Sequence, residues 1–184
     1  MGKNKYSKSF EIALSAIASA IAVIFLWLGM VPYLTGFGYL VGIFALMLPL
    51  SKQFFLGGFL AYLSTCILTL VLGAVAQFWN LVPFIIFFGL HPLVNCLQIR
   101  FKINRWLAFA VKAVWFIGML FVGYFMMLYG FIGGSILQHP FFERLNFYIY
   151  ILIPVVGAVI FLIYDYLIFR CQILVNSLVY RIRK

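Results

Sequence analysis

Long apolar runs, separated by short polar or glycine-containing breaks, dominate the pattern of this 184-residue chain. A helix needs about 20 predominantly apolar residues to cross the hydrocarbon core of a bilayer. The runs, bounded by charged, proline, glycine or amide residues, predict six spans at residues 10–31, 36–50, 54–75, 80–98, 105–134 and 146–170. The predicted fold is therefore all-α: a polytopic membrane protein with a single six-transmembrane-helix bundle over residues 1–184 and a basic cytoplasmic tail at 171–184.

Two of the predicted spans are irregular. The span at 36–50 is short and ends near Pro49, which favours a tilted or partly re-entrant helix held against protein. The span at 105–134 is overlong, and glycines crowd its end before Pro140. We expect that outer end to be unwound, since glycine weakens a helix interior.

Composition indicates a membrane protein, and the distribution of charge predicts its orientation in the membrane. Hydrophobic residues make up 67% of the chain and charged residues 9%, which excludes an ordinary water-soluble domain. The net charge of +10 lies in a few clusters, so it indicates orientation rather than nucleic-acid binding. With both termini in the cytoplasm, the outer side keeps only Arg144, next to Glu143, and eleven basic residues lie inside: Lys3, Lys5, Lys8, Lys52, Arg100, Lys102, Arg105, Arg170, Arg181, Arg183 and Lys184.

Three ionisable side chains fall within the spans, all toward the inner side: Glu11, Lys112 and Asp165. An ionisable residue inside a membrane is costly and suggests function by default, here a proton or ion relay. A relay would continue across the midplane, where these spans carry no carboxylate. The pattern favours neutralisation of Asp165 or Glu11 by Lys112.

Catalytic and metal-binding patterns are scarce. His91 precedes Pro92, which removes a backbone donor and predicts a kink. A metal site needs converging ligands, and the other histidine, His139, belongs to the opposite side. The three cysteines lie inside apolar runs and indicate packing. With three acidic residues in the chain and no hydrolase or phosphate-binding motif, we expect no enzyme, no metal and no cofactor.

The first span carries more small residues than one neighbouring helix requires. Helix association in lipid depends on close van der Waals contact through such side chains. The surplus suggests a partner protein on the inner half of this helix, with intramolecular packing as the alternative; the candidate partner-binding residues are Ala13, Ala16, Ala20 and Ala22.

Aromatic and amide side chains gather at the outer ends of the spans. The glycine-rich segment at 29–42 is predicted to be a loop that covers the bundle mouth as a lid. The candidate substrate-binding residues form either a pocket with a few polar anchors or an interfacial aromatic belt: Tyr33, Tyr39, Trp79, Asn80, Tyr124, Tyr129, Gln138, His139 and Tyr148.

The architecture resembles the substrate-binding S-component of energy-coupling factor (ECF) transporters. The resemblance rests on the length, the six spans, the internal termini, the lidded outer mouth and the alanines of the first helix spaced A-x-x-x-A. The run FFGLHPLVNCLQIRFKINRWL also resembles the fourth-to-fifth helix region of S-component-like proteins of Gram-positive bacteria.

The resemblance implies a subunit of an ABC importer in the plasma membrane of a Gram-positive bacterium. Such a subunit captures a vitamin or similar micronutrient outside and associates with a transmembrane coupling protein and two ATPases, the contact lying at Ala13, Ala16 and Ala20. The weakly charged mouth favours a neutral or aromatic compound. Two alternatives remain: a non-transporting scaffold similar to the MreD-type cell-shape proteins, and a proton-coupled secondary carrier.

Overall fold

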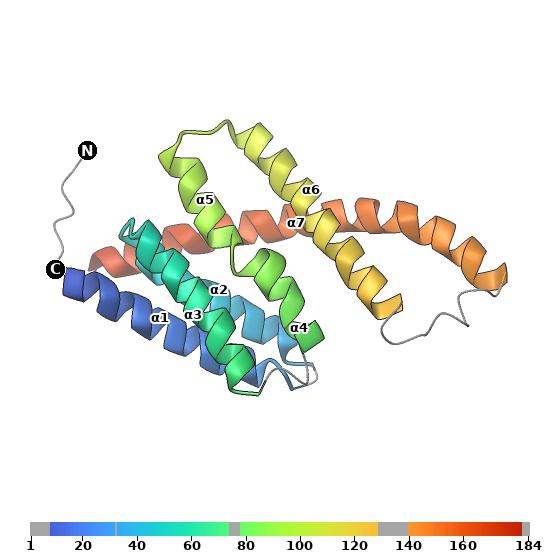
Figure 1. The fold of residues 1–184 in the computed structure, drawn as a ribbon. Helices are drawn as coiled ribbons and strands as arrows, with labels where there is room; N and C mark the ends of the chain where they lie inside the picture. The colour runs from blue at the N-terminus through green and yellow to red at the C-terminus, as the bar shows by residue number, and fades with distance from the viewer. Residues whose placement is uncertain (1–7, 32, 74–77, 129–139, 182–184) are drawn as a thin grey trace. The chain divides into compact units, whose positions relative to one another are not determined.

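The computed structural model describes residues 8–31, 33–73, 78–128 and 140–181, where helices connected by short turns form the whole structure (Figure 1). The elements in chain order are α1 (Lys8–Leu28), α2 (Thr35–Ser51), α3 (Phe55–Val71), α4 (Phe78–Pro83), the π-helical segment η2 (Phe84–Phe88), α5 (His91–Arg100), α6 (Arg105–Met127) and α7 (Pro140–Arg181). The all-α prediction is confirmed for these residues. Within the described residues, each predicted span overlaps a helix or the run from α4 to α5.

Four stretches are long and apolar enough to cross a membrane: Lys8–Leu28, Phe78–Arg100, Arg105–Met126 and Tyr148–Ser177. The helices α2 and α3 are equally apolar, but each is shorter, at 17 residues. Their outward surfaces carry isoleucine, leucine, valine and phenylalanine side chains, many of them more than half exposed. Such a surface is compatible with lipid rather than water as the surrounding medium.

Several helix ends differ from the predicted ones. The helix α2 begins at Thr35, so the lid loop predicted over 29–42 is wrong from that residue onward. The helix α7 continues to Arg181 instead of ending at Arg170, because residues 171–181 contain neither glycine nor proline to stop it. The end of the fifth span and its glycines, residues 129–134, lies outside the described residues.

The chain forms two compact units, one of residues 1–102 with 168–184 and one of residues 103–167. In the first unit, α1, α2 and α3 contact one another along their lengths, and Figure 1 shows them side by side. Large apolar side chains fill the interior of this unit, including Leu26, Ile43, Leu46, Phe54, Phe84 and Phe87, each at most 1% exposed.

Two glycines bring α1 and α2 into backbone contact. A Cβ atom added to Gly38 would lie 2.5 Å from the Phe25 carbonyl oxygen and 2.8 Å from the Gly29 Cα. The Gly38 side of α2 therefore packs directly on the end of α1. Glycine in this segment serves close helix packing, which explains why the chain resumes a helix at Thr35 instead of forming a long loop.

In the second unit, α6 and the first part of α7 meet through aromatic rings. The Asn104 side chain caps α6 by accepting a 3.0 Å hydrogen bond from the Trp106 amide. Along the contact, Phe161 lies with its ring centroid 5.2 Å from Phe109 and 5.5 Å from Phe116. Gly157 leaves room for Leu120, whose Cδ1 would be 2.8 Å from an added Cβ.

Candidate functional site

The small residues of α1 divide between two faces. Ser15, Ala18, Ser19 and Ala22 are buried, whereas Ala13, Ala16 and Ala20 are exposed. Of the four predicted partner-binding residues, Ala22 is therefore fully enclosed by its own chain and three lie on the surface. The first helix thus has more small residues than its packing inside the unit uses. One set of them packs inside the unit, and a second set remains on its surface.

Small hydroxyl side chains join α1 to α3. The Ser19 and Ser64 hydroxyl oxygens lie 2.8 Å apart, and 3.2 Å separates the Ser19 and Thr65 hydroxyl oxygens. Thr65 also lies 2.7 Å from the Ala61 carbonyl, as a hydroxyl bonded to its own helix does. These contacts explain the inward position of Ser19 and identify α3 as its intramolecular partner.

In the first unit, two predicted substrate-binding residues lie together. The Tyr39 hydroxyl donates a hydrogen bond to the Asn80 backbone carbonyl. The Tyr39 ring also packs 5.9 Å from the Phe84 ring and 5.3 Å from the Phe88 ring, between centroids. Tyr39 thus serves as a packing residue between α2 and the α4–η2 run, with its hydroxyl already bonded.

The other predicted residues of this group are more accessible. Trp79 is about half exposed and contacts Phe78 with a ring separation of 5.9 Å. Tyr33 is fully exposed and has a positive φ of 72°, a backbone conformation that residues other than glycine rarely adopt. Neither residue contributes to the packed interior.

The second unit contains the remaining described candidates, Tyr124 and Tyr148. Tyr124 packs edge-on against Tyr150, with 6.4 Å between the ring centroids, and Tyr148 is 69% exposed. The predicted residues Tyr129, Gln138 and His139 lie outside the described residues. The prediction of a pocket or a belt therefore stays a prediction.

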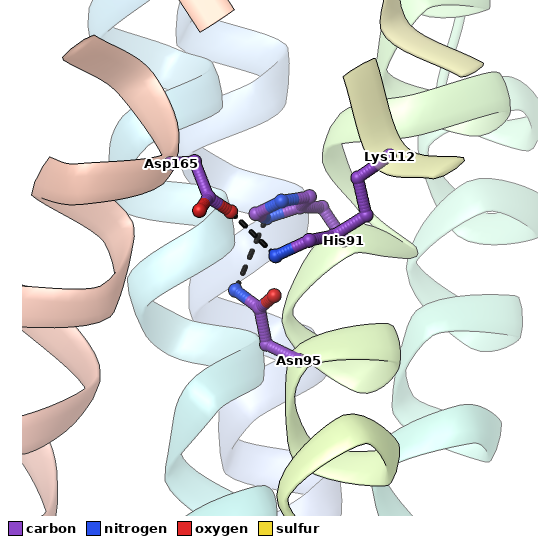
Figure 2. A network of polar contacts seen from close by, with 4 residues as sticks. All are labelled: His91, Asn95, Lys112 and Asp165. Atoms are coloured by element: carbon purple, nitrogen blue, oxygen red, sulfur yellow. Dashed lines mark hydrogen bonds and ion pairs between the residues drawn. The ribbon is translucent and has the colours of Figure 1, made fainter. Parts of the chain in front are cut away.

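Two of the three ionisable residues predicted within spans, Lys112 and Asp165, form an ion pair in the second unit. The Lys112 ammonium lies 2.6 Å from the Asp165 carboxylate, and the two side chains are 5% and 17% exposed (Figure 2). Phe109, Phe116 and Phe161 stack along the same helix contact. Lys112 therefore neutralises Asp165, one of the two partners that the sequence left open.

His91 lies beside Asn95 on the next turn of α5. Both are buried, and 3.4 Å separates His91 Nδ1 from Asn95 Nδ2, the second dashed contact in Figure 2. The His91 ring also packs 5.1 Å from the Phe87 ring. Within the described ranges, no group of three His, Cys, Asp or Glu side chains could hold a metal ion, and Cys66, Cys96 and Cys171 are free thiols.

The kink predicted at Pro92 stays a prediction, but the helix is interrupted in the turn that precedes this proline. The Gly89 amide donates 2.8 Å to the Phe84 carbonyl, a wide π-type bond, and the Leu90 amide donates to Phe87. The Ile85 carbonyl thereby loses its usual helical donor. The Tyr62 hydroxyl of α3 supplies the replacement over 2.7 Å. Sequence reasoning expected irregular helix near Pro92 but missed Tyr62, because this partner comes from a distant segment.

Replacing Tyr62 with phenylalanine should lower the free energy of unfolding by about 1 kcal/mol, because the Ile85 carbonyl then has no donor from Tyr62. Denaturant titration in mixed micelles measures this loss. The matched control, Tyr33→Phe, removes a hydroxyl from a fully exposed ring and should cost almost nothing. Equal stability of the two variants would contradict the assigned role of Tyr62.

Sequence reasoning also missed a groove of about 800 Å³ between the first part of α1 and most of α3. Lys8, Glu11 and Ser15 line it from α1, and Gly57 and Ser64 line it from α3. The sequence shows that Glu11 and Ser15 lie one turn apart on the same helix. It does not show which side of α3 faces them, so the groove could not be predicted.

Comparison with known proteins identifies no relative: no family model, curated protein or solved structure matches this chain.

Proposed function

We propose that this chain is the membrane-embedded substrate-binding subunit of an ECF-type importer. In this proposal the chain crosses the plasma membrane of a Gram-positive bacterium six times, keeps both termini in the cytoplasm and catalyses no reaction itself. The observation that carries the proposal is the exposed face of small residues on α1, at Ala13, Ala16 and Ala20.

This face suits a partner helix rather than lipid alone. Inside its own unit α1 already uses Ser15, Ala18, Ser19 and Ala22, so the three exposed alanines are not needed for that packing. Small side chains let another helix approach closely, which is the main source of helix association in a bilayer. The proposed partners are a transmembrane coupling protein, reached through this face, and the two ATPases that it carries.

The proposed substrate is a neutral or aromatic micronutrient taken up from outside. Supporting this in the first unit are the exposed rings of Tyr33 and Trp79. Aromatic rings offer large contact area at low entropic cost. The Asn80 backbone carbonyl is held by the Tyr39 hydroxyl, and the Tyr124 ring packs on the Tyr150 ring.

A scaffold subunit of the cell-shape type is the second candidate. The bonded Tyr39 hydroxyl favours it, because a residue predicted to meet substrate already has a partner within the fold. The secondary carrier loses support from the Lys112–Asp165 pair, which gives both charges a structural role. Both remaining candidates use the α1 face, so ligand binding is what separates them.

A micronutrient screen tests the proposal. A ligand that binds only the folded protein stabilises it by RT ln(1 + [L]/Kd), about 4 kcal/mol at a thousandfold excess over Kd. We expect one compound class to raise the midpoint of thermal unfolding of the purified protein, and mass spectrometry of the untreated preparation to find the same class. The absence of any shift across the screen would favour the scaffold.

Enlarging the small-residue face should separate coupling from binding. The double change Ala16→Leu and Ala20→Leu is expected to abolish co-purification with the coupling protein and to leave ligand affinity unchanged, because leucine holds a partner helix away. Ala110→Leu, which enlarges an exposed alanine of α6, is the matched control and should preserve co-purification. Loss of ligand binding in the double variant would contradict this assignment of the face.

A further inference from the structure

The groove between α1 and α3 runs along both helices and is walled by apolar side chains. Leu56, Leu60 and Ile67 line it from α3, and each is more than half exposed. The rise from Leu56 to Ile67 is about 16 Å, close to half of a hydrocarbon core about 30 Å thick. Its volume of about 800 Å³ falls in the range of sites for single small ligands. The groove thus has the length of one lipid leaflet.

Opposite charges stand at one end of this groove. Lys8 and Glu11 both line it, three residues apart on one side of α1. Among the described residues, no ion pair is formed by Glu11, whereas Asp165 is paired with Lys112. A carboxylate at the edge of a bilayer is costly without a cation. A zwitterionic group would satisfy both Lys8 and Glu11.

A buried hydroxyl lines the groove one turn further along. Ser15 is 8% exposed, and its Oγ has no hydrogen-bond partner in the described structure. An added Cβ on Gly57 would lie 2.5 Å from this oxygen, so the missing side chain of Gly57 is what lets the Ser15 hydroxyl pack against α3. A buried hydroxyl without a partner costs free energy, which points to an oxygen-bearing ligand that accepts its hydrogen.

We propose that this groove binds a phospholipid with a primary-amine headgroup, of the phosphatidylethanolamine type, in the leaflet where α1 begins. The ammonium donates to the Glu11 carboxylate, the phosphate faces Lys8, and a glycerol ester oxygen accepts from Ser15. One acyl chain lies along Leu56, Leu60 and Ile67. Headgroup recognition between transmembrane helices follows the same electrostatic logic. This site does not depend on nutrient uptake, and it lies beside the partner face, with Ala16 at their common edge.

The test uses the full-length protein reconstituted in vesicles of phosphatidylethanolamine and phosphatidylcholine in equal amounts, with phosphatidylglycerol as the anionic component. Native mass spectrometry after mild detergent extraction counts the lipids that remain bound. We expect one phosphatidylethanolamine per protein and about tenfold less phosphatidylcholine, because the quaternary amine has no N–H to donate to Glu11.

Two variants localise the binding. Glu11→Gln should reduce bound phosphatidylethanolamine about tenfold, and Leu60→Trp should displace the acyl chain. Leu107→Trp, which enlarges an exposed leucine of α6, is the control and should retain the lipid. Thermal unfolding in detergent checks that all three variants fold.

Three results would overturn the proposal: equal retention of the two lipids, retention of phosphatidylethanolamine by both Glu11→Gln and Leu60→Trp, and crosslinking of the groove to a partner helix with no lipid bound. None of them bears on the micronutrient screen, so this site and the transport function fail separately.

Discussion

Replacing Gly38 with alanine should lower the free energy of unfolding of the first unit more than any other single methyl addition to α2. The new Cβ would lie 2.5 Å from the Phe25 carbonyl oxygen and 2.8 Å from the Gly29 Cα. Both obstacles are backbone atoms, so α1 and α2 must move apart. Overpacking costs about 1–3 kcal/mol and occasionally more. We expect about 3 kcal/mol, measured as a lower free energy of unfolding in mixed micelles.

The same helix provides the control. A Cβ added to Gly36 meets no atom within 4 Å, so Gly36→Ala adds the same methyl group in open space. Because alanine favours helix over glycine by about 0.5–1 kcal/mol, that variant should be as stable as the parent or slightly more so. If Gly38→Ala is equally harmless, α1 and α2 do not approach at Gly38 as described.

Removing Lys112 should be the most damaging change in the second unit. Lys112→Met leaves the Asp165 carboxylate, 17% exposed, without its cation 2.6 Å away. Breaking a buried ion pair from one side costs about 3–5 kcal/mol. Asp165→Asn should cost less, about 1–3 kcal/mol, because the long lysine stem can carry its charge toward the membrane surface whereas the aspartate cannot. Unfolding titrations of both variants measure the difference.

The double variant Lys112→Met with Asp165→Leu separates a structural pair from a relay. It should recover most of the stability that Lys112→Met loses, since neither charge then remains buried alone. Substrate uptake by the double variant should recover together with its stability. A double variant that folds as well as the parent but takes up no substrate would revive the proton-coupled carrier.

Local sequence signals predicted most of the helices. The hydrophobic runs located α1, α3 and α6 to within a few residues at their starts, and Pro92 lies in the first turn of α5. Lengths of apolar runs and the missing amide of proline act locally, so a sequence displays them directly. The Asn104 cap of α6 belongs to the same class of local signal.

Features that depend on two distant segments could not be predicted in the same way. Glycines at 38 and 42 suggested a flexible lid, but the structure uses Gly38 for contact with Gly29. The pairing of Lys112 with Asp165, and not with Glu11, also depends on which helices meet. The division of the α1 alanines into Ala18 and Ala22 inside and Ala13, Ala16 and Ala20 outside follows from where α2 and α3 pack on α1.

The wide turn at Phe84–Phe88 also shifts the phase of its helix. A π-type turn accommodates one extra residue, and each residue of an α-helix turns the chain by about 100°. Trp79 and Asn80 therefore point about 100° away from where an unbroken helix through His91 would direct them. A homologue that lacks one residue in this segment must be aligned as two blocks, since a gapless comparison would match the residues before the turn to the wrong side chains.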